Sequence, residues 1–240
     1  MNEYSAFTVR DSVRRGFGMF SAGHFAWLLA GALFGFFLCR IYCGRDKKTR
    51  RLIRLAVAWS AVAVELLRAL LLAADGDFGI DRLPLHLCGL AIYISLFHAL
   101  CGTELSGQFL YGFCLPGALS ALIFPDWNGY PLLHFMTVCG FVLHFLIVTY
   151  VLMQTVSGDL VPDIKKTPAC LCIMLALAVP VYVFDILTGT NYMFLNWPSE
   201  GSPLEWFEFL GRPGYVLGYL PLLLSVWAVM YCPFRKAKVK

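Results

Sequence analysis

Residues 81–90 read DRLPLHLCGL and stand at the head of a long apolar segment. Proline is favoured in the first turn of a helix, because its missing N–H would be unpaired there, so Pro84 predicts a helix that starts close to it. Asp81 is suited to cap that helix. Such a helix carries His86 and Cys88 within about one and a half turns of its positive end, where a thiol can shift towards thiolate. A cysteine in an apolar helix can equally be a small packing residue, and both interpretations stay open here.

The composition is that of an integral membrane protein. Of 240 residues, 59% are hydrophobic and only 14% are charged, with a mean hydropathy of +0.70. Soluble domains have roughly 45–50% apolar and about 25% charged residues. The apolar stretches are long enough for bilayer-spanning helices and longer than the strands of a membrane barrel. We therefore expect an all-α polytopic membrane helix bundle without a soluble module.

A single transmembrane domain is expected over residues 1–240. Residues 1–21 are expected to form an interfacial segment, since apolar and arginine residues alternate at helical spacing. Residues 22–232 form the bundle and residues 233–240 a basic cytoplasmic tail. The seven expected spans cover about 22–43, 55–74, 84–101, 107–124, 132–153, 169–188 and 214–232.

Lysine and arginine set the expected direction of the spans. They are dense at residues 45–54 and in the C-terminal RKAKVK, whereas the loops after the second, fourth and sixth spans are acidic or neutral. The positive-inside rule then places the N-terminus outside and the C-terminus in the cytoplasm. Three arginines near the N-terminus disagree with this orientation: Arg10, Arg14 and Arg15. Because the net charge of +4 comes from such juxtamembrane clusters, it does not indicate nucleic-acid binding.

The nine cysteines do not form the pattern of a disulfide framework or a zinc site. Most lie within or at the ends of apolar spans. The motifs CRIYC at 39–43 and CLC at 170–172 have neither a companion histidine nor a second CxxC. We expect no metal and no other cofactor. No signal-peptide cleavage site precedes a polar mature chain.

Two opposite charges fall inside the second span. Glu65 and Arg68 are three residues apart and therefore on one face of a helix. Charges within a span are costly and are functional candidates by default. They can also form a structural pair near the membrane surface, with Arg68 snorkelling. Both interpretations stay open.

Several embedded polar residues fall at a similar depth when helical rise is counted from the outer surface, with Cys88 at roughly 7 Å. Six of them could line one outward-facing cavity: Glu65, Arg68, His86, Cys88, His134 and Asp185. His144 comes out deeper, at roughly 14 to 20 Å. Depth therefore favours His134 as a partner for Cys88, although helix tilt permits His144.

A thiol and an imidazole on facing helices indicate nucleophilic catalysis through a thioester intermediate. The reacting carbonyl also needs donors for its oxyanion, for which Asn191, Arg68 and the amides at the start of the third span are candidates. A cavity that opens sideways to lipid makes phospholipid the natural substrate.

Four motifs in order carry a resemblance to a known family: LPLHLC, YPLLHF at 130–135, VLHFL at 142–146 and TNYMFL at 190–195. From about Glu65 to Tyr215 the chain resembles the YwaF-like bacterial membrane proteins, which are related to eukaryotic transmembrane protein 164. The eukaryotic relative implies a cysteine-dependent acyltransferase that moves fatty acyl chains between phospholipids. A more distant resemblance links the chain to androgen-induced-gene-1-type membrane hydrolases, which use Thr and His on lipid esters.

The resemblance implies roles for particular residues. Cys88 is the expected nucleophile and His144 the expected base, with His134 as the second candidate. The substrate is expected to be a phospholipid or lysophospholipid of a bacterial cytoplasmic membrane. The expected substrate-binding residues are His86, Glu65, Arg68, Asp185, Asn191 and Tyr192. The chain departs from the family pattern at GRPGY, residues 211–215, and at Thr190, where a serine is expected.

A second hypothesis is non-enzymatic. In a small transporter or ligand-binding membrane protein, Glu65, Arg68, Asp185 and the histidines would line a path for a substrate or proton. No inverted repeat or pair of broken helices, which transporters often have, is evident. A scaffold subunit of a membrane complex is a third possibility. Transfer or hydrolysis and the oligomeric state stay open.

Overall fold

The computed structural model describes residues 16–234, and within them every regular element is helical. The expected tail and most of the interfacial N-terminal segment lie outside this range. The main helices are α2 (Ala22–Cys43), α3 (Lys47–Ala74), α4 (Leu87–Cys101), α5 (Glu104–Phe109), α6 (Leu115–Ile123), α7 (Phe135–Ser157), α8 (Thr167–Thr188) and α9 (Tyr219–Met230). Shorter helical turns are η1 (Ile80–Arg82), η2 (Leu110–Cys114), η3 (Ile164–Lys166), η4 (Tyr192–Phe194), η5 (Pro203–Leu210), η6 (Gly214–Gly218) and η7 (Cys232–Phe234).

The helices have the length and composition of membrane spans. Five described helical stretches are long and apolar enough to cross a bilayer: Ala22–Cys43, Lys47–Ala74, Glu104–Ile123, Phe135–Ser157 and Ile164–Thr188. The stretches Leu87–Cys101 and Gly214–Met230 are apolar but shorter. The prediction of a membrane helix bundle is confirmed, and five of its seven expected spans have the required length.

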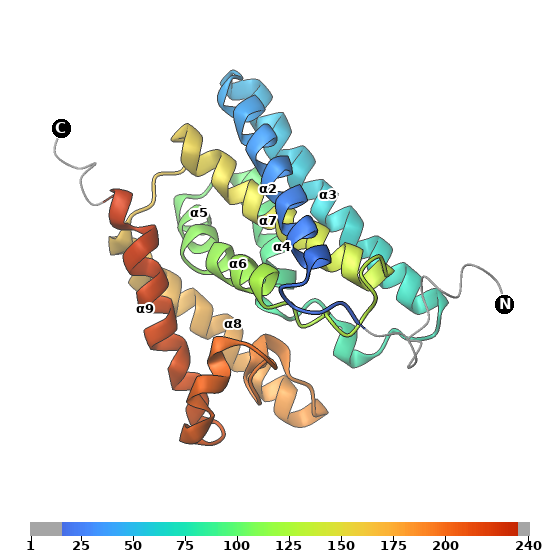
Figure 1. The fold of residues 1–240 in the computed structure, drawn as a ribbon. Helices are drawn as coiled ribbons and strands as arrows, with labels where there is room; N and C mark the ends of the chain where they lie inside the picture. Colours follow the sequence, from blue (N-terminus) through green and yellow to red (C-terminus); the bar gives the residue numbers. More distant parts are fainter. Residues whose placement is uncertain (1–15, 235–240) are drawn as a thin grey trace.

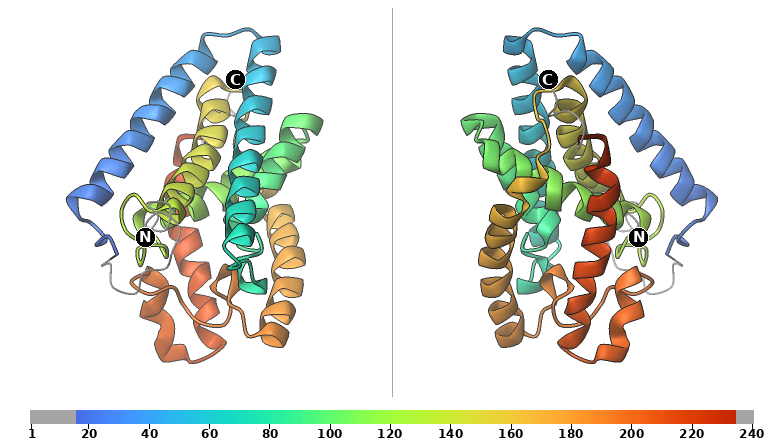
Figure 2. Two further views of the ribbon diagram at one scale, coloured as in Figure 1. Left: turned by 90° about the vertical axis from the view of Figure 1, so that its right-hand side faces the viewer. Right: turned by 90° about the vertical axis from the view of Figure 1, so that its left-hand side faces the viewer.

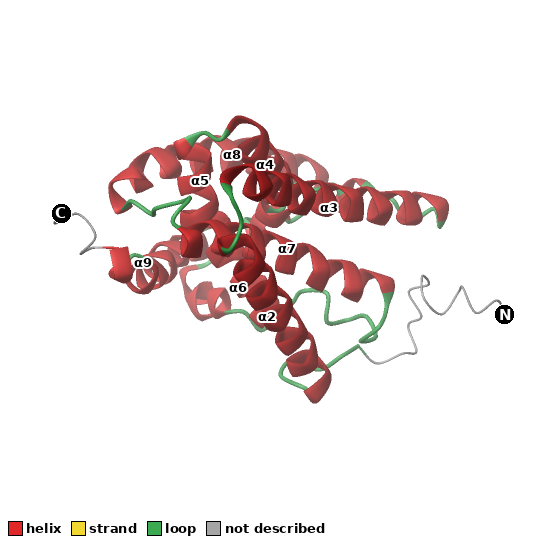
Figure 3. Ribbon diagram, turned by 90° about the horizontal axis from the view of Figure 1, so that it is seen from above, coloured by secondary structure: helices red, strands yellow, loops and turns green. Residues whose placement is uncertain are grey.

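The loops gather at two ends of the bundle. At the basic end, the last turn of α2 meets the α7–α8 loop through a hydrogen bond from Tyr42 to Asp159. At the other end, which we call the aromatic end, residues 75–86, 124–134 and 189–218 connect the helices. α2 and α3 join at the basic end and diverge towards the aromatic end (Figures 1 and 2). α7 lies between them and packs against α2, α3, α4 and α6 (Figure 3).

Capping side chains set several helix boundaries. α2 has the predicted bounds, with the Ser21 hydroxyl accepting a hydrogen bond from the His24 N–H at 3.3 Å. α3 begins at Lys47, well before the expected 55, because Asp46 caps it by accepting from the Thr49 N–H at 3.3 Å. That hydrogen bond lowers the pKa of Asp46. α7 begins later than the expected 132, at Phe135.

The start of α4 corrects the prediction from Pro84 and Asp81. α4 begins at Leu87 with His86 as its N-cap, and Asp81 lies in the turn η1 instead of capping the helix. The residue before a proline is pushed towards extended backbone, and Leu83 has φ −67° and ψ 151°. Cys88 is therefore the second residue of its helix, closer to the positive end than expected.

The fourth span is interrupted by a π-helical turn, η2. Pro116 has no N–H, so it cannot bond to the Gly112 carbonyl four residues earlier. That carbonyl instead accepts a hydrogen bond from the Trp227 indole N–H at 2.6 Å. The irregular turn thus attaches α9 to the bundle, because a polar group inside a membrane requires a partner.

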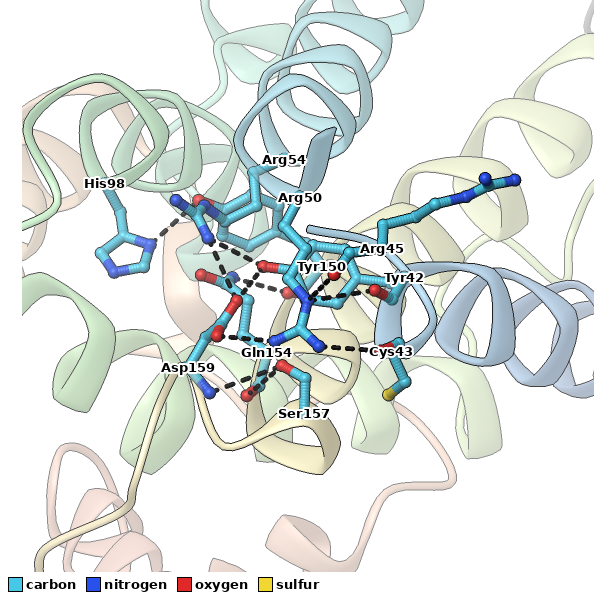
Figure 4. Close-up of polar contacts among 10 residues, drawn as sticks. All are labelled: Tyr42, Cys43, Arg45, Arg50, Arg54, His98, Tyr150, Gln154, Ser157 and Asp159. Carbon is cyan, nitrogen blue, oxygen red and sulfur yellow. Dashed lines mark hydrogen bonds and ion pairs between the residues drawn. The ribbon is translucent and has the colours of Figure 1, made fainter. Parts of the chain in front are cut away.

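A polar cluster around Asp159 holds the basic end together (Figure 4). The Asp159 carboxylate accepts from the Tyr42 hydroxyl at 2.6 Å and forms ion pairs with Arg50 at 2.9 Å and Arg54 at 3.4 Å. Arg50 also donates to the carbonyl of Cys43 at 2.8 Å. Tyr42 is fully buried. One aspartate therefore fixes the α2–α3 hairpin to the end of α7.

We predict that Asp159→Asn lowers the free energy of unfolding by about 1.5 to 3 kcal/mol, because it removes charge-assisted hydrogen bonds from a half-buried cluster. Thermal unfolding in detergent, followed by circular dichroism, measures the change. Glu104→Gln is the matched control, because the Glu104–Lys166 pair is long, at 3.7 Å, and both side chains are exposed. Equal melting temperatures for the two variants would contradict a stabilising role for Asp159.

Candidate functional site

A pocket of about 270 Å³ opens at the aromatic end, between the start of α4 and the segment after α8. Three of the predicted site residues line it: His86, Asn191 and Tyr192. The other lining residues are Asp81, Asp126, Gly189, Thr190, Phe194 and Trp197. Two carboxylates, an imidazole and three aromatic rings therefore surround one space.

His86 presents a proton donor at this pocket. Its Nδ1 accepts a hydrogen bond from the Met193 N–H at 3.2 Å, so the neutral ring carries its proton on Nε2. The ring packs against Tyr192 and Phe194, with centroids 5.1 and 5.2 Å away. As the N-cap of α4, His86 stands two residues before Cys88.

Asp185 and Tyr192 build the wall of the pocket. Asp185 is fully buried, and its Oδ1 accepts from the Thr190 hydroxyl at 2.6 Å and the Tyr192 N–H at 2.9 Å. The Tyr192 hydroxyl donates to the Ile80 carbonyl at 2.6 Å and accepts from the Leu83 N–H at 2.9 Å. The family resemblance predicts a serine at position 190. The Thr190 hydroxyl makes the same kind of hydrogen bond to Asp185 that a serine hydroxyl could make. These contacts position the loops on both sides of the pocket.

The Asn191 side chain forms hydrogen bonds with backbone groups of the loop that follows it. Its side-chain oxygen accepts from the N–H groups of Asn196 at 2.9 Å and Trp197 at 3.1 Å, and its amide donates to the Trp197 carbonyl at 2.8 Å. The amide is therefore already engaged in shaping the pocket. Trp197 is held in the wall by the same contacts.

His144 presents a proton acceptor. Its Nδ1 lies 2.6 Å from the Gly140 carbonyl, which can only accept, so the neutral ring has its lone pair on Nε2. The Trp127 ring covers it, with centroids 4.8 Å apart. Trp127 comes this close because residue 140 is glycine: a Cβ there would lie 2.7 Å from the indole ring. His144 keeps part of its surface accessible.

Asp126 connects the separate parts of the site. It precedes Trp127 in the α6–α7 loop and lines the pocket with His86, and the Trp127 ring in turn covers His144. The sequence FPDWNGYP at residues 124–131 is typical of a turn between two spans, and Asp126 was not among the predicted site residues. The feature that could have identified Asp126 is its charge, because the other residues of this turn are uncharged.

Cys88 lies in the first turn of α4 and is partly exposed. It packs beside the main hydrophobic core. Within the described residues, no hydrogen bond joins its thiol to His86 or His144. N–H groups in a first helical turn have no partner within the helix, so the Cys88 and Gly89 amides are possible oxyanion donors. A Cβ at Gly89 would lie 2.6 Å from the Pro84 carbonyl oxygen, so glycine permits the tight approach of the loop.

His134 is the N-cap of α7. Its Nδ1 accepts from the Met136 N–H at 3.2 Å, and its ring stacks on Tyr130 with centroids 4.6 Å apart. It is almost fully buried. These contacts give His134 a role in starting the helix that carries His144.

Glu65 and Arg68 form the intrahelical pair that the sequence suggested as one alternative. Two guanidinium nitrogens of Arg68 donate to the two Glu65 oxygens at 2.6 and 2.8 Å, and one of them also donates to the Arg82 carbonyl at 2.9 Å. Both side chains are largely buried. The contacts favour a structural role that joins α3 to the loop before α4.

The nine cysteines are free, and the part of the chain that the structure describes contains no group of three or more His, Cys, Asp or Glu residues that could hold a metal ion.

Comparison with known proteins gives one match. The family model described as the TMEM164 family matches residues 19–231, which is most of the chain. No curated protein and no solved structure matches. The matched region contains the pocket, Cys88 and His144.

We predict that Glu65→Gln lowers the free energy of unfolding by about 3 to 5 kcal/mol, because it leaves the buried Arg68 charge without its partner. The double variant Glu65→Leu with Arg68→Leu should recover much of this loss, since no charge remains buried. Thermal unfolding in detergent measures both. Full stability of Glu65→Gln would contradict the structural role and favour a pair that acts in a substrate or proton path.

Proposed function

Since the chain belongs to the TMEM164 family, we propose that it is an integral membrane acyltransferase or lipid-ester hydrolase that acts on phospholipid acyl chains through Cys88. The observation that carries the proposal is that His86 and Asp126 line one open pocket, with Cys88 in the helical turn that follows His86 and with His144 under the ring of Trp127, the neighbour of Asp126. The proposal favours His144 over His134 as the base, because its Nε2 carries the lone pair and the Nδ1 bond to Gly140 fixes the ring.

The first half of the reaction forms an acyl-enzyme. His144 Nε2 takes the thiol proton, and the Cys88 thiolate attacks the ester carbonyl carbon of a phospholipid. The tetrahedral oxyanion accepts hydrogen bonds from amides in the first turn of α4 and from His86 Nε2–H. As the ester C–O bond breaks, the departing glycerol oxygen takes the proton from His144. The products are a lysophospholipid and a thioester on Cys88.

The second half removes the acyl group from the enzyme. A lysophospholipid hydroxyl, or water, gives its proton to His144 and attacks the thioester carbonyl. The C–S bond breaks, and the Cys88 sulfur recovers its proton from His144. Attack by lysophospholipid gives acyl transfer, and attack by water gives hydrolysis.

In the proposed reaction, Cys88 and His144 come within hydrogen-bond distance when substrate binds. Catalytic hydrogen bonds are often long in a free enzyme and tighten when substrate binds. The site lies at a helix N-terminus, whose unpaired N–H groups stabilise an oxyanion. Asp126 offsets the positive charge that His144 gains when it holds the proton. The pocket lies at the aromatic end of the bundle. In the proposed topology, this is the level of the phospholipid headgroups and their ester bonds.

We predict that Cys88→Ala abolishes formation of the acyl-enzyme. The purified protein is reconstituted with a phospholipid that carries an alkyne-tagged acyl chain, and the thioester is detected as a hydroxylamine-sensitive tag on the protein. His144→Asn should slow tagging by about 10² to 10⁴-fold. Cys172→Ala is the control, because Cys172 is an exposed cysteine elsewhere on the bundle and should be tagged normally. A hydroxylamine-sensitive tag and full turnover in Cys88→Ala would overturn the proposal.

We also propose that α4 and α9 complete seven spans, with the aromatic end outside and the basic end in the cytoplasm of a bacterial membrane. The charge asymmetry supports this topology. The basic end carries most of the lysines and arginines, including Arg45, Lys47 and Lys48, whereas Asp75, Asp77 and other acidic residues mark the aromatic end.

The topology predicts which cysteines an impermeant reagent can reach. Added to intact cells, a membrane-impermeant maleimide should label a cysteine introduced as Asp77→Cys, and should not label Cys101 or Cys232, which are exposed at the basic end. Both native cysteines should react after the cells are opened. Labelling of Cys101 and Cys232 in intact cells, with Asp77→Cys protected, would reverse the orientation.

A further inference from the structure

The 3₁₀ helix η5, PLEWFEFL at Pro203–Leu210, has three chemically different faces. A 3₁₀ helix has three residues per turn, so side chains three apart lie over one another. Leu204 and Phe207 form the inner face: Leu204 is 4% exposed, and Phe207 packs where a Cβ at Gly218 would lie 2.4 Å from its ring. The helix is therefore attached to the protein by one face.

The outer face is apolar and unusually open. Trp206 and Phe209 are three residues apart, so they project on the same side, and they are 73% and 80% exposed. Glu205 and Glu208 form the third face by the same spacing. A large aromatic pair beside an acidic pair is the pattern of an element at a boundary between apolar and aqueous surroundings.

The outer face continues the apolar surface of the neighbouring helices. η5 lies at the aromatic end, where it packs against η6, the turn that leads into α9 (Figure 1). On α8, apolar residues are exposed at every fourth position, ending at Leu187, which is 79% exposed. On the α9 side, Leu217 and Leu220 are 62% and 52% exposed. In a membrane protein such residues face the bilayer, and Trp206 and Phe209 are exposed apolar residues at the same end of the bundle.

We propose that η5 is an interfacial anchor whose Trp206 and Phe209 insert into the headgroup layer of the leaflet at the aromatic end. Aromatic side chains favour this depth. The acidic face distinguishes η5 from the basic helices that bind anionic lipids, so its partner is a zwitterionic or neutral lipid surface. Glu205 and Glu208 then lie towards water.

The anchor is connected to the pocket. η5 ends at Leu210, and two residues later the Arg212 guanidinium lies 5.5 Å from the centre of the Trp197 ring, a pocket wall. Insertion of η5 therefore holds the pocket mouth at the level of the headgroups. This inference requires membrane embedding and does not depend on catalysis by Cys88.

Tryptophan fluorescence in phosphatidylcholine liposomes tests the anchor. The emission of Trp206 is obtained as the difference between the wild-type protein and Trp206→Phe, a conservative change. We expect this emission to be lost when the lipids are brominated near the glycerol end of the acyl chain. Bromination near the methyl end should have less effect, and iodide in the outer solution should have little effect.

Trp59 provides the matched control, because it is 53% exposed and lies far from both ends of α3. Trp59 lies on the hydrocarbon-spanning part of α3, so the emission lost in Trp59→Phe should be quenched by brominated lipid and not by iodide. Quenching of Trp206 by iodide, without quenching by brominated lipid, would place the outer face in water and overturn the proposal. Protection of Trp206 from both quenchers would overturn it in favour of a covering protein, either a second copy or another partner.

Discussion

The arrangement of the pocket depends on the buried hydroxyl of Tyr192. It donates to the Ile80 carbonyl and accepts from the Leu83 N–H, so one phenol links the segment after α8 to the segment before α4. Asp185 holds the Tyr192 backbone from below. Both residues are buried in the protein, so leaving either group without a hydrogen-bond partner would cost about 1 to 3 kcal/mol. This requirement fixes where α4 starts and therefore the place of Cys88.

Two histidines near one carboxylate adopt complementary tautomers. The Met193 N–H makes His86 Nδ1 an acceptor, whereas the Gly140 carbonyl makes His144 Nδ1 a donor. In their neutral forms, one ring therefore offers a proton and the other offers a lone pair on the remaining nitrogen. Backbone groups, which side-chain substitution leaves in place, determine this difference. The acid and base properties that the proposed reaction needs thus arise from how each ring is held.

Hydropathy and charge predicted the helical bundle and the bounds of α2. Long apolar stretches fit few structures other than spanning helices, and a serine cap marks where a helix begins. The start of α4 was not predictable from Pro84, because a distant residue, Tyr192, holds the preceding turn in place. His86, Asn191 and Tyr192 line the pocket, and their roles in substrate binding stay predictions. Asp126 was missed because its importance depends on packing of Trp127 over Gly140, a contact between loop and helix that local sequence does not reveal. The catalytic roles of Cys88 and His144 stay predictions.

α3 is longer than the hydrocarbon core of a bilayer, and the extra length lies at only one end of the protein. Its 28 residues span about 42 Å, whereas a hydrocarbon core is about 30 Å thick. The surplus lies at the basic end, where the first turns of α3 carry charges and join the Asp159 cluster. In a thicker membrane, more of this charged stem would enter the headgroup region. A change in bilayer thickness is therefore accommodated at the basic end. The pocket keeps its depth relative to the leaflet at the aromatic end.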